Sequence, residues 1–81
     1  MASLSREDQK MVAARAAEFK KFRRDFLFSQ QNLSEALGCS RRTIMSIESG
    51  QVVNPHADLL RRFRNLRRAE ERAALMAGEA A

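Results

Sequence analysis

The chain has 81 residues and a mass of 9.2 kDa, enough for one compact domain but not for two. Hydrophobic residues make up 44% and charged residues 31%, a balance typical of a globular protein and too apolar for a disordered one. Gly, Pro and aromatic residues are scarce, so the composition predicts an all-α fold. The N-terminus lacks the pattern of a signal peptide, and no apolar run has the length of a membrane span, so we expect an intracellular protein.

The single cysteine, Cys39, excludes an internal disulfide and a Cys-rich zinc site. The single histidine, His56, leaves no set of residues for metal binding or for acid–base catalysis. The chain also lacks a Gly-rich phosphate loop and a nucleophile–base pair. The sequence therefore predicts no cofactor, no metal and no enzymatic activity.

The charge is distributed unevenly along the chain. Lys and Arg total 15 and Asp and Glu total 10, a net charge of +5. The whole surplus lies in residues 41–68, where every basic residue is an arginine. Arginine offers a rigid fork of donors that suits phosphates and guanine edges. Three explanations stay open at this point: a nucleic-acid surface, a solvated helix face, and contact with an anionic membrane or an acidic protein.

The first predicted helix is long and runs over residues 5–27. Ser5, followed three residues later by Asp8, resembles a helix start. Apolar residues then recur every three or four positions and predict one core-facing stripe. The stripe consists of Val12, Ala16, Phe19, Phe22 and Phe26.

A short second helix is expected over residues 30–37, with Ser29 as its N-cap and Gly38 at its C-terminal end. Its expected inward positions are Leu33, Ala36 and Leu37. Cys39 lies in the connection that follows and is interpreted as a small buried hydrophobe rather than a reactive thiol.

The third predicted helix spans residues 41–49, with Ser40 as its N-cap and Gly50 after its end. Ile44 and Ile47 are expected to face inward. A loop leads to Pro55, which is typical of the first position of a fourth helix. From there the apolar pattern predicts one long helix, or two joined near Asn65, and hence a bundle of about five helices. The pattern residues are Leu59, Leu60, Phe63, Leu66, Ala69, Ala73 and Met76.

Two short helices joined by a three-residue turn that contains Gly are typical of a helix-turn-helix unit, here residues 30–49. The helices of such a unit cross steeply, and Ser34 provides a small residue near the crossing. The second helix would then be free to enter the major groove. Its outer face carries Arg41, Arg42, Met45, Ser46 and Ser49.

The segment Ser29–Gly50, SQQNLSEALGCSRRTIMSIESG, resembles the Xre/Cro/CI family of prokaryotic helix-turn-helix repressors. The resemblance extends over residues 19–66. It differs from the family pattern at Ser34, where Ala is usual, and at Cys39, where Val is usual. The segment after Leu66 does not match the family's fifth helix. The resemblance implies a λ repressor-like DNA-binding fold for the single domain 1–81, with a C-terminal helical tail at 67–81.

The resemblance also implies residue roles. Arg41 and Arg42 match positions that reach base edges, Ser46 matches a third reading position, and Met45 is either a thymine-methyl contact or a partly exposed filler. Phosphate contacts are implied for the start of the second helix, for the third helix and for the loop that follows it; Ser40 is equally a plain N-cap, and Gln30 is alternatively a solvated residue. The implied phosphate-contacting residues are Gln30, Ser40, Thr43, Ser49, Gln51, Asn54 and His56.

Arg23 and Glu48 resemble the family's buried ion pair, with a phosphate contact as the alternative role of Arg23. A basic cluster follows in the C-terminal segment: Arg61, Arg62, Arg64, Arg67 and Arg68. These arginines, Arg61 and Arg62 above all, contact flanking phosphates, form a dimer contact with acids such as Glu70 and Glu71, or are solvated.

Together these features predict a sequence-specific transcriptional regulator, a repressor or autorepressor, that binds a palindromic operator in double-stranded DNA as a homodimer. The expected location is the cytoplasm, in association with the nucleoid. The alternative is a protein-binding module, an antitoxin or antiactivator, whose C-terminal helix engages a partner protein. A membrane-surface helix over residues 59–76 is disfavoured because its apolar face is narrow and lacks Trp.

Overall fold

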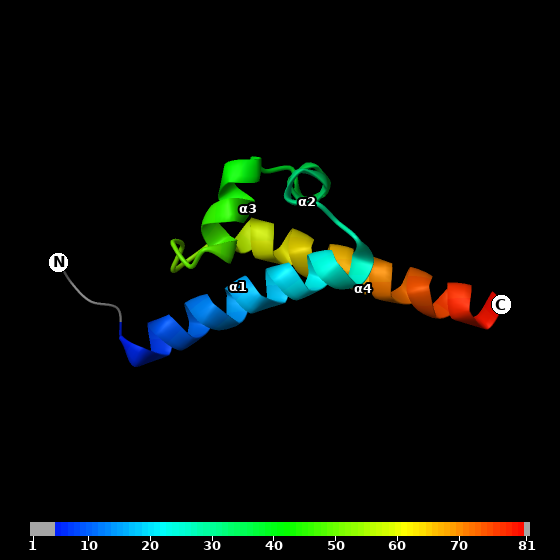
Figure 1. Cartoon of the computed structure of the whole chain (residues 1–81), viewed down its shortest axis with the longest axis horizontal. Coiled ribbons are helices and arrows are strands. Elements are labelled where there is room, and N and C mark those ends of the chain that lie inside the picture. Colours follow the sequence, from blue (N-terminus) through cyan, green and yellow to red (C-terminus); the bar gives the residue numbers. More distant parts are fainter. Residues whose placement is uncertain (1–4, 81) are drawn as a thin grey trace.

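The fold is all-α, as the composition predicts. The computed structural model describes residues 5–80, with side chains up to residue 78, so the ends of the expected domain 1–81 and tail 67–81 lie outside the described residues. The described residues form four helices and no strand: α1 (Arg6–Phe26), α2 (Gln30–Leu37), α3 (Arg41–Glu48) and α4 (Ala57–Ala80). The long helices α1 and α4 cross, and α2 and α3 lie together on one side of them (Figure 1). None of the described helices is long and apolar enough to span a bilayer.

Three serines begin three of the helices. The hydroxyl oxygens of Ser5, Ser29 and Ser40 accept hydrogen bonds from the backbone N–H three residues ahead, at 3.1, 2.9 and 3.2 Å. Each bond satisfies a donor that the first helical turn leaves without an intrahelical partner. These caps explain why the predicted starts of α1, α2 and α3 agree with the structure.

The end of α1 is strained. Leu27 adopts a left-handed conformation, with φ 59°, and its side chain is 88% exposed. The left-handed conformation costs a residue that has a Cβ about 1 kcal/mol or more. Because the Leu27 side chain is exposed, burial does not offset this cost.

We therefore expect Leu27→Gly to raise the free energy of unfolding by about 1 kcal/mol, since glycine adopts this conformation without the Cβ clash. Thermal unfolding should show a melting temperature higher by roughly 4–8 °C. Leu75→Gly is the matched control, because Leu75 is also exposed but lies within the helical backbone of α4. An equal rise for both substitutions would contradict the strain argument.

The core joins all four helices. Phe19 of α1 and Phe63 of α4 stack with ring centroids 4.1 Å apart, and Phe22 meets Phe63 edge-on at 5.4 Å. Aromatic contacts of this kind add to the stabilisation from burial. The core cluster consists of Phe19, Phe22, Leu33, Leu37, Ile44, Ile47, Leu59 and Phe63.

The predicted inward position of Ala36 is wrong, because Ala36 is exposed and Ser34 takes its place in the interior. Leu33, Ser34 and Leu37 share one side of the two-turn helix α2, whereas residue 36 lies about 100° away from its neighbour Leu37. The Ser34 hydroxyl donates to the Gln31 carbonyl at 2.7 Å, which satisfies the buried polar group.

The expectation of about five helices differs from the structure, where α4 continues through the position of the expected junction near Asn65. No Pro or Gly interrupts the segment 57–77, and Ala, Arg, Glu and Leu favour helix. Phe63 is the last buried residue of α4, and residues 71–78 are all exposed. The N-terminal half of α1 and the C-terminal half of α4 therefore project in opposite directions from the core (Figure 1), giving extents of 54 × 24 × 20 Å.

Candidate nucleic-acid interface

A tight connection, Gly38–Ser40, joins α2 to α3. Gly38 has φ +69°, and a Cβ at this position would lie 3.1 Å from Nη1 of Arg62. The N–H of Cys39 donates to the Ser34 carbonyl at 3.0 Å and closes the end of α2. The side chain of Cys39 is half-buried, and this burial raises the pKa of its thiol, as expected for a residue that packs rather than reacts.

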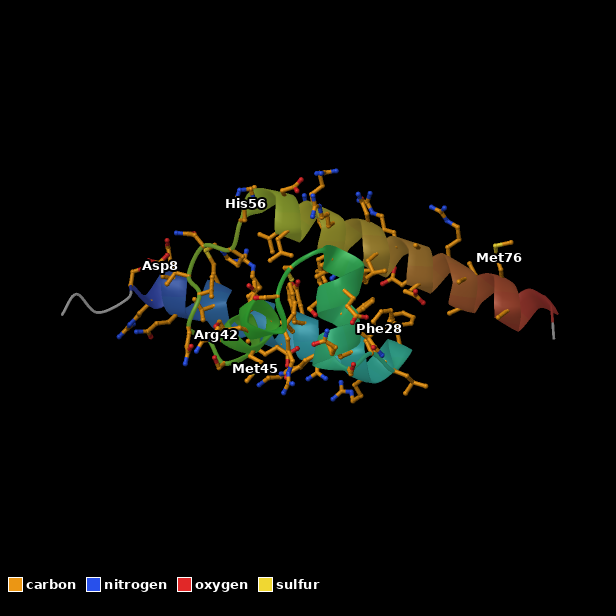
Figure 2. All side chains as sticks on the ribbon, turned by 90° about the horizontal axis from the view of Figure 1, so that it is seen from above. Asp8, Phe28, Arg42, Met45, His56 and Met76 are labelled. Carbon is orange, nitrogen blue, oxygen red and sulfur yellow. The ribbon has the colours of Figure 1, made fainter. Side chains whose placement is uncertain are left out.

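Helix α3 has two distinct sides. Ile44 and Ile47 are buried in the core, whereas Arg41, Arg42 and Met45 are exposed. Figure 2 shows Arg42 and Met45 on the side of the molecule away from α4. Within residues 5–78, the guanidinium groups of Arg41 and Arg42 make no hydrogen bond or ion pair, so both are available to a ligand.

Ser46 lies at the edge of this surface and is half-buried. Its carbonyl accepts hydrogen bonds from the Ser49 hydroxyl at 3.2 Å and from the Gln51 N–H at 2.9 Å. The Ser46 side chain is thus less accessible than the two arginines.

The predicted ion pair between Arg23 and Glu48 is present and bidentate. Nε and Nη2 of Arg23 each lie 2.7 Å from a carboxylate oxygen of Glu48, whose side chain is only 5% exposed. The hydrogen bond to Glu48 raises the pKa of the Arg23 guanidinium above its usual value, so Arg23 stays protonated. Arg23 also donates to the Phe28 carbonyl at 3.4 Å. The pair ties α1 to the end of α3.

Gln30, the predicted phosphate contact at the start of α2, is held by the same carboxylate. Its side-chain Nε2 donates to Glu48 Oε1 at 3.3 Å, which leaves its second amide hydrogen for a ligand. The residue borders a shallow hollow of about 450 Å³. Arg41 and Gln31 also line this hollow, although neither of them was predicted to contact a phosphate. Their positions at the starts of α3 and α2 are the feature of the sequence that could have indicated a phosphate contact.

The predicted phosphate contacts Ser40 and Thr43 are bonded to each other. The Ser40 hydroxyl caps Thr43 N–H, and the two side-chain oxygens lie 2.9 Å apart. The structure thus gives Ser40 the N-cap role that the sequence left open, and Thr43 is half-buried. The loop residues Gln51 and Asn54 are exposed, so their predicted phosphate contacts stay predictions.

His56 begins α4. Its Nδ1 accepts a hydrogen bond from the Asp58 N–H at 3.2 Å, and its carbonyl accepts one from Leu60 at 3.1 Å. The predicted helix start at Pro55 is therefore two residues early, because His56 supplies the cap and Ala57 is the first helical residue. The exposed imidazole keeps its other nitrogen for a phosphate, so that predicted role stays open.

Arg61 and Arg62 both pair with Asp58, Arg62 Nη2 at 2.9 Å from Oδ2. The hydrogen bond from Arg61, and then the positive charges of both arginines, hold the pKa of Asp58 below its usual value. Arg62 Nη1 also donates to the Leu37 carbonyl at 3.2 Å, at the C-terminal end of α2. Within the molecule Arg62 thus caps α2, and its predicted phosphate contact would require that it leave these partners or share them.

We expect Arg62→Ala to lower the free energy of unfolding by about 1 kcal/mol, because it removes a charge-assisted hydrogen bond at the end of α2. Denaturant titration checks this through the unfolding midpoint. Arg64→Ala is the matched control, since Arg64 is exposed and makes no ion pair within residues 5–78. Equal midpoints for the two variants would remove the capping role.

Arg67 packs against the core and does not lie on an open surface. Its guanidinium lies 5.7 Å from the ring centroid of Phe63 and 3.8 Å from a Glu18 carboxylate oxygen. Arg64 and Arg68 are exposed. Intramolecular contacts, which were not among the three alternatives for the C-terminal cluster, engage Arg61, Arg62 and Arg67. The three alternatives stay predictions.

The exposed guanidinium groups on α3, with the hollow beside α2, can bind an anion or hydrogen-bond acceptors on a flat edge. No group of His, Cys, Asp or Glu side chains in residues 5–78 is placed to hold a metal ion. Comparisons with protein-family models, curated proteins and solved structures found no significant match to the chain. The functional argument therefore rests on the geometry of α2, α3 and their supports.

Proposed function

We propose that the protein is a sequence-specific, double-stranded DNA-binding regulator of transcription. In this proposal α2 and α3 form a helix-turn-helix of the λ repressor-like type, and α3 is the recognition helix. One observation carries it. Helix α3 is fixed to the core by two buried isoleucines and by the ion pair at its end, and it presents Arg41 and Arg42 outward without intramolecular partners.

The chemistry of this face suits base edges in the major groove. Arginine makes bidentate hydrogen bonds to guanine O6 and N7, and Met45 offers an apolar contact for a thymine methyl group. Ser46, at the edge, would read a base through water. The hollow beside Gln30 and Arg41 would take a phosphate, which the positive end of the α2 dipole also favours.

The proposed regulator acts as a homodimer on a palindromic operator, with half-sites about one helical turn apart. It represses transcription by covering the promoter. Its own gene is a natural target, because occupancy of the operator rises with the concentration of the protein. This role places it in the cytoplasm, with the nucleoid.

Selection of bound duplexes from a random pool, with sedimentation analysis of the protein, tests the proposal. The expected result is one enriched palindrome and a dimer on the enriched duplex. Absence of any enriched sequence at low ionic strength, where electrostatic attraction to DNA is strongest, would rule the regulator out.

A protein-binding module is the second candidate, and the distal part of α4 favours it. Residues 71–78 are exposed, and Leu75 and Met76 are 66% and 62% exposed. A contiguous exposed apolar patch marks a partner contact, and Leu75 and Met76 are adjacent on this exposed end of α4. Capture of one partner that Leu75→Ser and Met76→Ser abolish, together with indifference to DNA, would support this candidate over the regulator.

A further inference from the structure

Helix α1 carries an exposed stripe of four basic residues and two alanines. Its members follow one another at intervals of four, three, four, three and four residues, which places them within roughly 80° of the helix circumference. All of them are exposed. This stripe, called the α1 ridge below, consists of Arg6, Lys10, Ala13, Ala17, Lys20 and Arg24.

No acidic residue lies on the α1 ridge. The acids of α1 fall on other sides of the helix, and two of them have cationic partners. Asp25 bonds Lys21 at 2.6 Å and lies 3.8 Å from Nε of Arg24, a member of the ridge, and Glu18 lies 3.8 Å from Arg67. By contrast, Arg6, Lys10 and Lys20 make no ion pair within residues 5–78. Outside residues 41–68 the charges of the chain balance in number, yet the charged residues of the α1 ridge are all basic.

Ala13 and Ala17 have much shorter side chains than the basic residues on either side, so the surface of the α1 ridge is lower in the middle than at its ends. With only a Cβ at Ala13 and Ala17, a bulky ligand can approach the helix while Lys10 and Lys20 reach around it. The ridge also borders the proposed recognition helix. Ala13, Ala17 and Lys20 line a hollow of about 530 Å³, together with other residues of α1 and with the end of α3, where Glu48, Ser49 and Gly50 lie. The Glu48 carboxylate is neutralised there by its ion pair with Arg23.

We infer that the α1 ridge is a second DNA-contacting surface, which binds the sugar–phosphate backbone of the duplex whose major groove α3 enters. The inference rests on the proposed function for the identity of the duplex. Three cations without an ion pair within the described side chains, Arg6, Lys10 and Lys20, on a line without acidic residues, are complementary to a strand of phosphates. A second copy of the chain would bring the same positive charges against the ridge, and a membrane surface would require large apolar residues where the ridge has alanine.

The experiment compares two triple variants that remove the same charge. One is Arg6→Ala/Lys10→Ala/Lys20→Ala on the α1 ridge. The other is Arg64→Ala/Arg68→Ala/Arg72→Ala on α4, at exposed arginines that make no ion pair within the described side chains. Alanine favours helix at all six positions, so both variants should fold, which circular dichroism checks. Binding to the selected duplex and to a scrambled duplex is measured across a salt series.

The ridge variant should reduce the slope of log K against log salt by roughly 2–3, about 0.9 for each lost phosphate contact. It should weaken binding to both duplexes equally, and the α4 variant should change the slope by less than one contact. Lys10→Arg/Lys20→Arg should keep the wild-type slope.

An unchanged slope in the ridge variant, or an equal fall in both triple variants, would overturn the inference. So would a loss of binding to single-stranded RNA without any loss on the duplexes. Sequence preference of the wild-type protein tests the proposed function separately. If the wild-type protein binds duplexes through the ridge but without sequence preference, the proposed regulator is contradicted, whereas the ridge is supported as a DNA-contacting surface.

Discussion

Glu48→Ala is expected to lower the free energy of unfolding by about 3 kcal/mol, the lower end of the range for breaking a buried ion pair. Glu48 is 5% exposed and accepts both hydrogen bonds of the Arg23 fork and one from Gln30. Its removal leaves the Arg23 guanidinium without its counter-charge between α1, α2 and α3. A quarter of the Arg23 side chain remains exposed, which is why we expect the lower end of the range.

Thermal unfolding measures this loss as a melting temperature lower by roughly 15 °C, given 4–8 °C per kcal/mol for a domain of this size. Lys21→Ala is the control, because it breaks the exposed pair with Asp25, for which less than about 1 kcal/mol is expected. If Glu48→Ala and Lys21→Ala unfolded at the same temperature, the Arg23–Glu48 pair could not be the tie that fixes α3.

The helices could be predicted from the sequence because their signals are local. Ser29 and Gly38 bracket α2, and the hydrogen bonds that end a helix need only residues within three or four positions. The same is true of Ser5 and of Ser40. The spacing of Phe19 and Phe22 also identified the core side of α1, since one amphipathic period spans only a few residues.

The candidate site was less predictable where a side chain has a choice of partners. Arg62 and His56 carry no sequence signal that separates a phosphate contact from a helix cap. Only the placement of the Leu37 carbonyl and of the Asp58 N–H beside them decides their intramolecular bonds. Ala36 illustrates a similar limit, because Ala36 and Ser34 both fit a helix period with Leu33 and Leu37. Only the packing of α2 into the core shows that Ser34 is the buried one.

The α1 ridge shows a different limit. Counting charges along the chain gives a balance outside residues 41–68 and conceals the acid-free ridge on α1. The ridge is indicated by the helical register of Lys10, Ala13, Ala17 and Lys20. This register can be recognised once the helix is known to be continuous from Arg6 to Phe26. A net charge therefore says less about a partner than the side of the helix on which each charge lies.

Arg41→Ala and Arg42→Ala are each expected to reduce the preference for the selected duplex over a scrambled one by about 5- to 150-fold, which corresponds to about 1–3 kcal/mol. The expected loss is in discrimination, because a bidentate arginine contact to guanine is absent from the wrong sequence in any case. The fold should survive, since neither side chain makes a hydrogen bond or ion pair within residues 5–78 and alanine favours helix.

Competition binding at constant salt measures the ratio of the two affinities, with Arg64→Ala as a control of equal charge at an exposed position on α4. A smaller loss at one of the two arginines would indicate that this arginine contacts the phosphate at the hollow beside Gln30, which Arg41 also lines. Full preference in both variants would remove α3 as the reading element, because no other exposed side chain on that helix can make a bidentate contact to a base pair.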